Sequence, residues 1–215
     1  FTAASSEAVK ISAQHLQESD YALYQTSIAS WALGNYAKKK EIFQNAIKKY
    51  DGSNYIASMK YELANTYLTL EENKSAIQTY QSIIDAHPQS IHTRDCYAKI
   101  GMIYYKLGED KKALVYLDKL VKTYPESKEA RLALANIKAI YVEANKVDEF
   151  ISYTSTIPNA KISVGEQDSI SFQAAENLYM EGNYKNAMSG FKQYLAKYPD
   201  GAFSVTANYY LADCL

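Results

Sequence analysis

A period of 37 residues runs through the chain and constrains its fold more than any other feature. Alanine and proline mark this period: Ala113 and Pro125 recur as Ala187 and Pro199 two periods later, and Pro88 stands one period before Pro125. Windows opened at residues 20, 57, 94, 131, 168 and 205 hold register without insertion, and the last is cut short by the end of the sequence. Such regular self-similarity indicates a stack of repeated structural units.

Each window predicts two amphipathic helices of about 14 residues, because apolar residues recur at spacings of three and four on both sides of a helix-ending residue. That residue occupies the fifteenth place of the window, as Gly34, Glu71, Gly108, Asn145 and Gly182. Gly and Asn tolerate the left-handed conformation that commonly ends a helix, and Glu71 is the exception. A proline near the end of most windows stops the second helix, since proline cannot continue one.

Small residues at the eighth place predict that two helices approach each other closely. The third window has the most regular pattern, with Tyr97, Ile100, Gly101, Tyr104, Ala113, Leu117 and Pro125 at the marked places. This pattern resembles the tetratricopeptide repeat, whose signature combines an aromatic residue, Leu-Gly and Tyr in a first helix with Ala, an aromatic residue and Pro in a second.

The resemblance covers residues 20 to 215 and implies an all-α fold. In this family, helix hairpins stack into a right-handed superhelix, or solenoid, with the first helices lining a concave surface. The domain organisation that follows is one array of repeats starting at 20, 57, 94, 131, 168 and 205. Residues 1–19 are then the helical remnant of a preceding repeat, or an N-terminal cap.

The fourth window breaks the pattern. Lys138 and Phe150 stand where small residues are usual, and Pro158 falls four places before the position at which the other prolines close their repeats. We therefore expect the second helix to stop early and an irregular, mobile connection of about six to ten residues to follow. Ser163 and Glu166 have the spacing of a capping box, which predicts an early start of the next helix and a bend or widened groove there.

Composition and charge exclude several classes of function. The formal net charge is −1 and the pI is near 6.4, which argues against nucleic acid as a partner because its affinity depends on neutralising phosphates. No apolar stretch reaches the length of a membrane span, so we expect no membrane insertion by this segment. The sequence begins at Phe1 and ends inside a first helix, which indicates a piece of a longer protein whose targeting signal lies elsewhere.

Catalytic, cofactor and metal motifs are missing from the sequence. There is no Gly-x-Ser-x-Gly elbow, no His-Glu-x-x-His motif and no phosphate-binding loop. Cys96 and Cys214 lie in the first helices of distant repeats and are expected to be free thiols, and the three histidines have no metal-ligand spacing. We expect a protein that is not an enzyme and that needs neither a cofactor nor a metal.

Tyrosine is the residue that points to binding, since 21 of the 215 residues are Tyr. In the family that the sequence resembles, the second, fifth, ninth, twelfth and thirteenth places of each first helix face the groove. Those places give the predicted partner-binding groove: Tyr21, Tyr24, Ile28, Trp31, Tyr61, Asn65, Leu68, Met102, Tyr105, Lys106, Phe172, Glu176, Tyr179 and Met180. Tyr and Trp offer large contact areas at low entropic cost, although ordinary packing is the alternative role for these rings.

These features predict a non-enzymatic scaffold that binds a protein or peptide segment along the concave groove. A glycan-binding aromatic surface, and a module that self-associates through the truncated ends of the array, are the alternatives. Residues 123–137 and 193–215, which contain Tyr-Pro-x-Ser and Tyr-Pro-x-Gly, resemble bacterial envelope repeat proteins of the YbgF and BamD type. That resemblance implies a bacterial protein that is located in the periplasm or associated with the outer membrane. A cytoplasmic location is the alternative.

Overall fold

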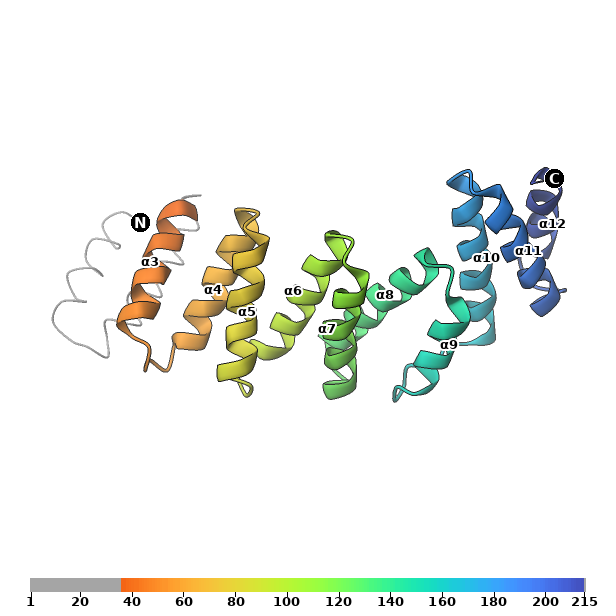
Figure 1. Ribbon diagram of the computed structural model, residues 1–215. Coiled ribbons are helices and arrows are strands. Elements are labelled where there is room, and N and C mark those ends of the chain that lie inside the picture. The colour runs from red at the N-terminus through yellow and green to blue at the C-terminus, as the bar shows by residue number, and fades with distance from the viewer. Residues whose placement is uncertain (1–35, 215) are drawn as a thin grey trace. The chain divides into compact units, whose positions relative to one another are not determined.

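The computed structural model describes residues 36–214, which form ten α-helices and no strand (Figure 1). The predicted segment 1–19 and the first helix of the first window lie outside these residues. The chain divides into two compact units, one ending at Glu109 and the other beginning at Asp110. This boundary falls inside the third window, between its first and second helices, and each unit is described separately below.

The first unit contains four described helices that pack on one another in chain order. They are α3 (Tyr36–Lys49), α4 (Ile56–Thr69), α5 (Asn73–Ala86) and α6 (Thr93–Lys106). All four have the predicted length of 14 residues. A core cluster between α3 and α4 consists of Phe43, Ala46, Tyr50, Ile56, Met59 and Leu63. The apolar faces that the sequence predicts are therefore the faces that meet.

The second unit contains six described helices. They are α7 (Asp110–Thr123), α8 (Lys128–Glu143), α9 (Val147–Ser155), α10 (Val164–Met180), α11 (Tyr184–Lys197) and α12 (Ser204–Asp213). The core cluster of α10, α11 and α12 is built from Phe172, Ala175, Ala187, Phe191, Tyr194 and Ala207. The predicted all-α architecture of repeated helix hairpins is thus confirmed for the described residues.

The turn between the two helices of a window has the same geometry in each of the four windows that the structure describes there. The fifteenth place holds a positive φ in every case: 60° at Glu71, 70° at Gly108, 54° at Asn145 and 76° at Gly182. The backbone N–H of the following residue donates to the carbonyl five residues back, as from Glu109 to Tyr104. This is a Schellman motif, and it satisfies carbonyls that the end of a helix leaves without partners.

Glu71 adopts this conformation despite its side chain. A non-glycine residue with positive φ crowds its own Cβ and costs about 1–2 kcal/mol. We expect Glu71→Gly to raise the free energy of unfolding by about 0.5–1 kcal/mol in urea titrations followed by circular dichroism, after the entropic cost of glycine is subtracted. Glu71→Ala keeps the Cβ and should give no gain; an equal gain in both variants would contradict the role of φ.

Small residues bring two helices of the fifth repeat together. Gly190 on α11 faces Ala175 on α10 so closely that a Cβ added at Gly190 would lie 2.9 Å from the Ala175 Cβ. Ala175 occupies the eighth place of its window, where the sequence predicts a small residue for this purpose. The close approach of α10 and α11 therefore depends on the absence of a side chain at Gly190.

The fourth repeat lacks this close approach, and its second helix is short. Lys138 occupies the place equivalent to Ala175, and Tyr153 the place equivalent to Gly190. Helix α9 has nine residues and ends at Ser155, before Pro158, as predicted. The buried ring of Phe150, which is 1% exposed, fills the place of the usual alanine. Bulky side chains thus occupy both of the places that are small in the fifth repeat.

The connection from α9 to α10 comprises residues 156–163, in agreement with the expected length. Helix α10 begins at Val164, and the Ser163 Oγ accepts a hydrogen bond from the Glu166 N–H at 3.2 Å. The predicted early start and Ser163 cap are therefore confirmed. The Glu166 carboxylate pairs with Lys138 at 3.2 Å, so the unusual lysine of the fourth repeat links α8 to α10. The mobility of the connection and the bend of the groove stay predictions.

We expect Gly190→Ala to lower the free energy of unfolding by at least about 1 kcal/mol, because the new Cβ overpacks the α10–α11 contact. Gly165→Ala is the matched control, since Gly165 is also helical and a Cβ there meets nothing within 4 Å. Alanine favours the helix, so this control should leave stability unchanged or raise it by up to about 1 kcal/mol. Thermal and urea unfolding measure the stability of both variants. A stabilised Gly190→Ala variant would contradict the proposed packing.

Candidate functional site

The first helices of neighbouring repeats are joined by side chains in the first unit. The Tyr61 hydroxyl on α4 donates a hydrogen bond to the Asp95 carboxylate on α6. The Tyr61 ring stacks on His92, with centroids 4.3 Å apart and planes at 14°, and His92 Nε2 lies 3.0 Å from the Ser58 Oγ. We call Ser58, Tyr61, His92 and Asp95 the α4–α6 cluster. Its contacts fix the Tyr61 ring in one orientation.

The α4–α6 cluster keeps both of its rings uncharged at neutral pH. Burial, followed by the hydrogen bond and negative charge of Asp95, raises the pKa of Tyr61 above its ordinary value. Burial lowers the pKa of His92, and the nearby Glu62 and Asp95 carboxylates only partly oppose this effect. The cluster therefore presents a neutral stacked pair beside a carboxylate.

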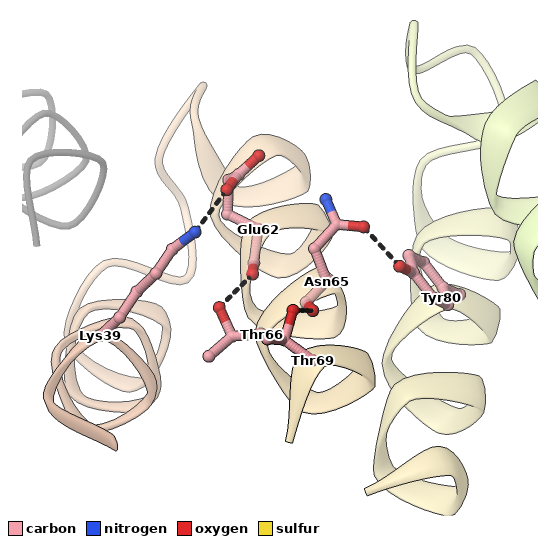
Figure 2. A network of polar contacts seen from close by, with 6 residues as sticks. All are labelled: Lys39, Glu62, Asn65, Thr66, Thr69 and Tyr80. Atoms are coloured by element: carbon pink, nitrogen blue, oxygen red, sulfur yellow. Dashed lines mark hydrogen bonds and ion pairs between the residues drawn. The ribbon is translucent and has the colours of Figure 1, made fainter. Parts of the chain in front are cut away.

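The neighbouring polar residues of α4 are held from both sides (Figure 2). Lys39 reaches from α3, and its Nζ lies 2.8 Å from the Glu62 Oε2. On the other side, the Tyr80 hydroxyl of α5 donates to the Asn65 Oδ1 at 2.6 Å. The Lys39 side chain is only 5% exposed, so a partner for its charge is essential. This pairing accounts for a lysine at a place where the repeat usually has alanine.

A similar arrangement occurs in the second unit, between α10 and α12. The Tyr179 hydroxyl donates to the Asp213 carboxylate, and this hydrogen bond raises the pKa of Tyr179 to about 12. The Tyr179 ring stacks on Tyr210 at 4.5 Å and meets Tyr184 edge-on at 5.5 Å. Tyr209, which is 67% exposed, lies beside Tyr210. We call these five residues the α10–α12 cluster.

The two clusters use the same sequence separation. Tyr61 and Asp95 are 34 residues apart, and so are Tyr179 and Asp213. This separation is three residues less than the repeat period, so in each case a tyrosine of one first helix bonds to an aspartate of the next first helix. The repeat therefore produces tyrosine rings that are fixed before any partner arrives.

The predicted groove residues differ in their exposure to solvent. Tyr21, Tyr24, Ile28 and Trp31 lie outside the described residues. The half-buried members are Tyr61, Asn65, Leu68, Tyr105, Glu176 and Tyr179, and the exposed members are Met102, Lys106 and Met180. These nine residues remain available, wholly or partly, to a partner.

The prediction for Phe172 is wrong. Its side chain is 4% exposed and belongs to the core of α10, α11 and α12. The ring stacks on Phe203 at 4.6 Å and packs on Phe191 at 6.0 Å, because α11 and the turn before α12 cover it. Phe172 therefore contributes stability and not a contact surface.

The sequence prediction missed seven residues of the two clusters. The second, fifth and ninth places of their windows hold Ser58, Asp95, Tyr209 and Asp213, so the rule that selected the groove residues would also have selected these four. Tyr184 and Tyr210 lie at other places of their windows. His92 precedes its window, and only its separation of 34 residues from Ser58 could have signalled the contact.

Within residues 36–214, no group of three His, Cys, Asp or Glu residues could hold a metal ion. None of the helices that the structure describes is long and apolar enough to cross a membrane. Cys96 and Cys214 are free thiols, and burial raises the pKa of Cys96 to about 12, so its reactive thiolate form is scarce at neutral pH.

Family models identify the repeat. One tetratricopeptide repeat model matches residues 95–127 and 170–201, and a second matches residues 17–91, so the matched segments make up more than half of the chain. The chain is a tetratricopeptide repeat protein. Proteins with this fold commonly act as scaffolds that bind protein or peptide partners. No curated protein matches the chain.

Several solved structures share the fold at low sequence identity. A tetratricopeptide repeat protein from Parabacteroides merdae is 19% identical, with a TM-score of 0.58, over 91% of this chain and 72% of that one. BtubC from P. vanneervenii is 11% identical, with a TM-score of 0.56, over 90% and 86% of the two chains. YrrB, described as having an unusual peptide-binding site, is 16% identical, with a TM-score of 0.52, over 87% and 91%.

Alkaline pH tests the α4–α6 cluster. Unfolded tyrosine loses its proton near pH 10, whereas Tyr61 in the folded chain keeps it to higher pH. The folded chain then binds more protons at Tyr61, so the contribution of Tyr61 to the free energy of unfolding is fully present below pH 10 and is lost as the pH rises through the folded pKa. We expect Tyr61→Phe to make this fall shallower in urea unfolding between pH 9 and 12. A fall that is equally steep in Tyr61→Phe and in the unchanged chain would contradict this role of Tyr61.

Proposed function

We propose that this chain is a non-enzymatic scaffold that binds a protein or peptide segment through the first-helix faces of its repeats. The tyrosines that are fixed by carboxylates of the next repeat carry the proposal. Tyr61 is held by Asp95, and Tyr179 by Asp213. Rings whose orientation is set in advance lose little entropy when a partner binds, and tyrosine is among the residues that dominate binding energy.

The chemistry around the fixed rings supports an extended peptide as the partner. The Asn65 amide lies on the same helix as Tyr61, one turn further along, and amides suit the hydrogen-bonding groups of a peptide backbone. Met102 on α6 and Met180 on α10 are exposed at 39% and 65%, and flexible thioether side chains adapt to varied apolar side chains. In the first unit, Tyr61 and Met102 offer apolar contact and Asn65 a polar anchor. In the second unit, Tyr179 and Met180 offer apolar contact.

We further propose that the partner belongs to a bacterial cell-envelope assembly. The support for this location is the Tyr-Pro-x-Ser and Tyr-Pro-x-Gly turns at residues 124–127 and 198–201, which resemble those of envelope repeat proteins. Fractionation of the native host with an antibody against this chain tests the location, and recovery in the cytoplasm would contradict it.

A peptide-display selection against the whole chain tests the binding function. We expect selected peptides to bind with affinities that Tyr61→Ala or Tyr179→Ala weakens by about 5–30-fold, as measured by isothermal titration calorimetry, because hot-spot tyrosines contribute about 1–2 kcal/mol. Asp95→Asn should weaken binding less, since it loosens the ring and leaves it in place.

Gln78→Ala is the control, because Gln78 is an exposed residue of a second helix, α5. Circular dichroism establishes that each variant is folded. Equal losses of affinity in Gln78→Ala and Tyr61→Ala would contradict a first-helix binding face. Selective binding to a glycan array, with no peptide recovered, would favour a sugar-binding surface instead.

A further inference from the structure

A cavity of about 340 Å³ lies in the second unit, among residues of α7, α8 and α9. It is lined by Lys111, Leu114, Val115, Asp118, Lys122, Ile137, Tyr141 and Tyr153. Five of its lining residues come from α7, two from α8 and one from α9. Second helices contribute most of this lining, so the cavity is distinct from the first-helix faces described above.

The departure of the fourth repeat from the regular pattern explains why the cavity exists. Tyr153 occupies the place at which the fifth repeat has Gly190, and Lys138 the place of Ala175, so α8 and α9 cannot pack as closely as α10 and α11 do. Helix α9 is also five residues shorter than α11. The space that a regular second helix would fill is therefore left open beside α7.

The lining of the cavity is apolar and aromatic. Ile137 is buried at its floor, and Val115 is 63% exposed at its rim. The Tyr141 and Tyr153 rings lie 6.4 Å apart with their planes at 28°. Flat, apolar groups pack favourably against such rings. A volume near 300 Å³ is at the lower end of the range for ligand pockets and suits one large side chain.

One polar position in this lining is not fully used. The Asp118 Oδ1 and the Tyr153 hydroxyl are shielded from solvent. Burial, followed by the charge of Asp118 and a hydrogen bond to it, raises the pKa of Tyr153. The Lys122 Nζ lies 2.9 Å from the Asp118 Oδ1, and this lysine is 57% exposed. A carboxylate offers about four acceptor sites, so beside Lys122 and Tyr153 the Asp118 carboxylate can accept a further hydrogen bond from a group inside the cavity.

We propose that this cavity binds an aromatic side chain carrying a hydrogen-bond donor, a Trp or Tyr of a protein partner, with the donor directed at the Asp118 carboxylate. Lys111 and Lys122 repel a cationic side chain, and Asp118 repels an anionic one. A neutral ring with an N–H or O–H packs against the apolar lining and donates a hydrogen bond to the Asp118 carboxylate. This site is independent of the proposed function at the first-helix faces.

Small probes test the site on the whole chain. We propose a titration with indole and with 1-methylindole, which has the same ring system but no N–H, followed through the backbone amide signals in two-dimensional NMR spectra. Indole should shift the amides of α7, α8 and α9 in a saturable manner and bind roughly 3–10-fold more tightly than 1-methylindole. Equal affinities for indole and 1-methylindole would overturn the role of Asp118. Amide shifts that do not saturate, or that are not confined to α7, α8 and α9, would overturn the site.

Variants make the test specific. Asp118→Leu removes the acceptor and should abolish the preference for indole over 1-methylindole, whereas Asp85→Leu, at an exposed carboxylate of α5, should preserve it. Val115→Trp places a ring over the cavity from an exposed position that tolerates substitution, and it should prevent binding of both probes. Unchanged indole binding in a folded Val115→Trp variant would overturn the proposal even if Asp118→Leu failed to fold.

A comparison of blocked amino acids tests the class of partner. N-acetyltryptophanamide should shift the same amides as indole, and N-acetyl-leucinamide should bind at least about fivefold more weakly, a difference near 1 kcal/mol. Equal binding of the two compounds would show that the cavity selects apolar size alone and would overturn the proposed aromatic donor.

Discussion

Reversal of the chain at the fifteenth place of the windows that the structure describes is the constraint on which the rest of the fold depends. A left-handed residue there lets the next backbone N–H reach back to a carbonyl of the first helix, as Glu109 does to Tyr104. The turn is short and hydrogen-bonded, so α5 is returned onto α4, and α11 onto α10, with few unsatisfied backbone groups. The core cluster of α10, α11 and α12 depends on the turn at Gly182, which places α11 against α10.

Features that local chemistry encodes could be predicted from the sequence. The helix ends depend on Gly, Asn and Pro, and the cap of α10 depends on Ser163, so each can be recognised within a few residues. The early end of α9 before Pro158 belongs to the same class. Glu71 shows the limit of this reasoning, because the packing of two helices imposes a positive φ on a residue that does not favour it.

Contacts between repeats could not be predicted with the same success. The burial of Phe172 depends on Phe203 and α11, which cover a ring that the repeat pattern assigns to the open face. The bond from Tyr61 to Asp95 joins residues 34 positions apart, and its existence depends on how far one first helix is displaced along the next. The positions within each window select candidate groove residues. The displacement of neighbouring helices and the burial by other side chains decide which of these residues remain accessible to a partner.

The loose packing of the fourth repeat has a consequence for cooperativity. In a repeat array each repeat is stabilised by its neighbours. A weak contact between repeats therefore divides the array into segments that open independently. Helix α9 is short, and Lys138 and Tyr153 keep it from the close packing seen between α10 and α11. Its amide hydrogens should therefore exchange with solvent through a local opening that leaves α10, α11 and α12 intact, and unfolding of the second unit begins there.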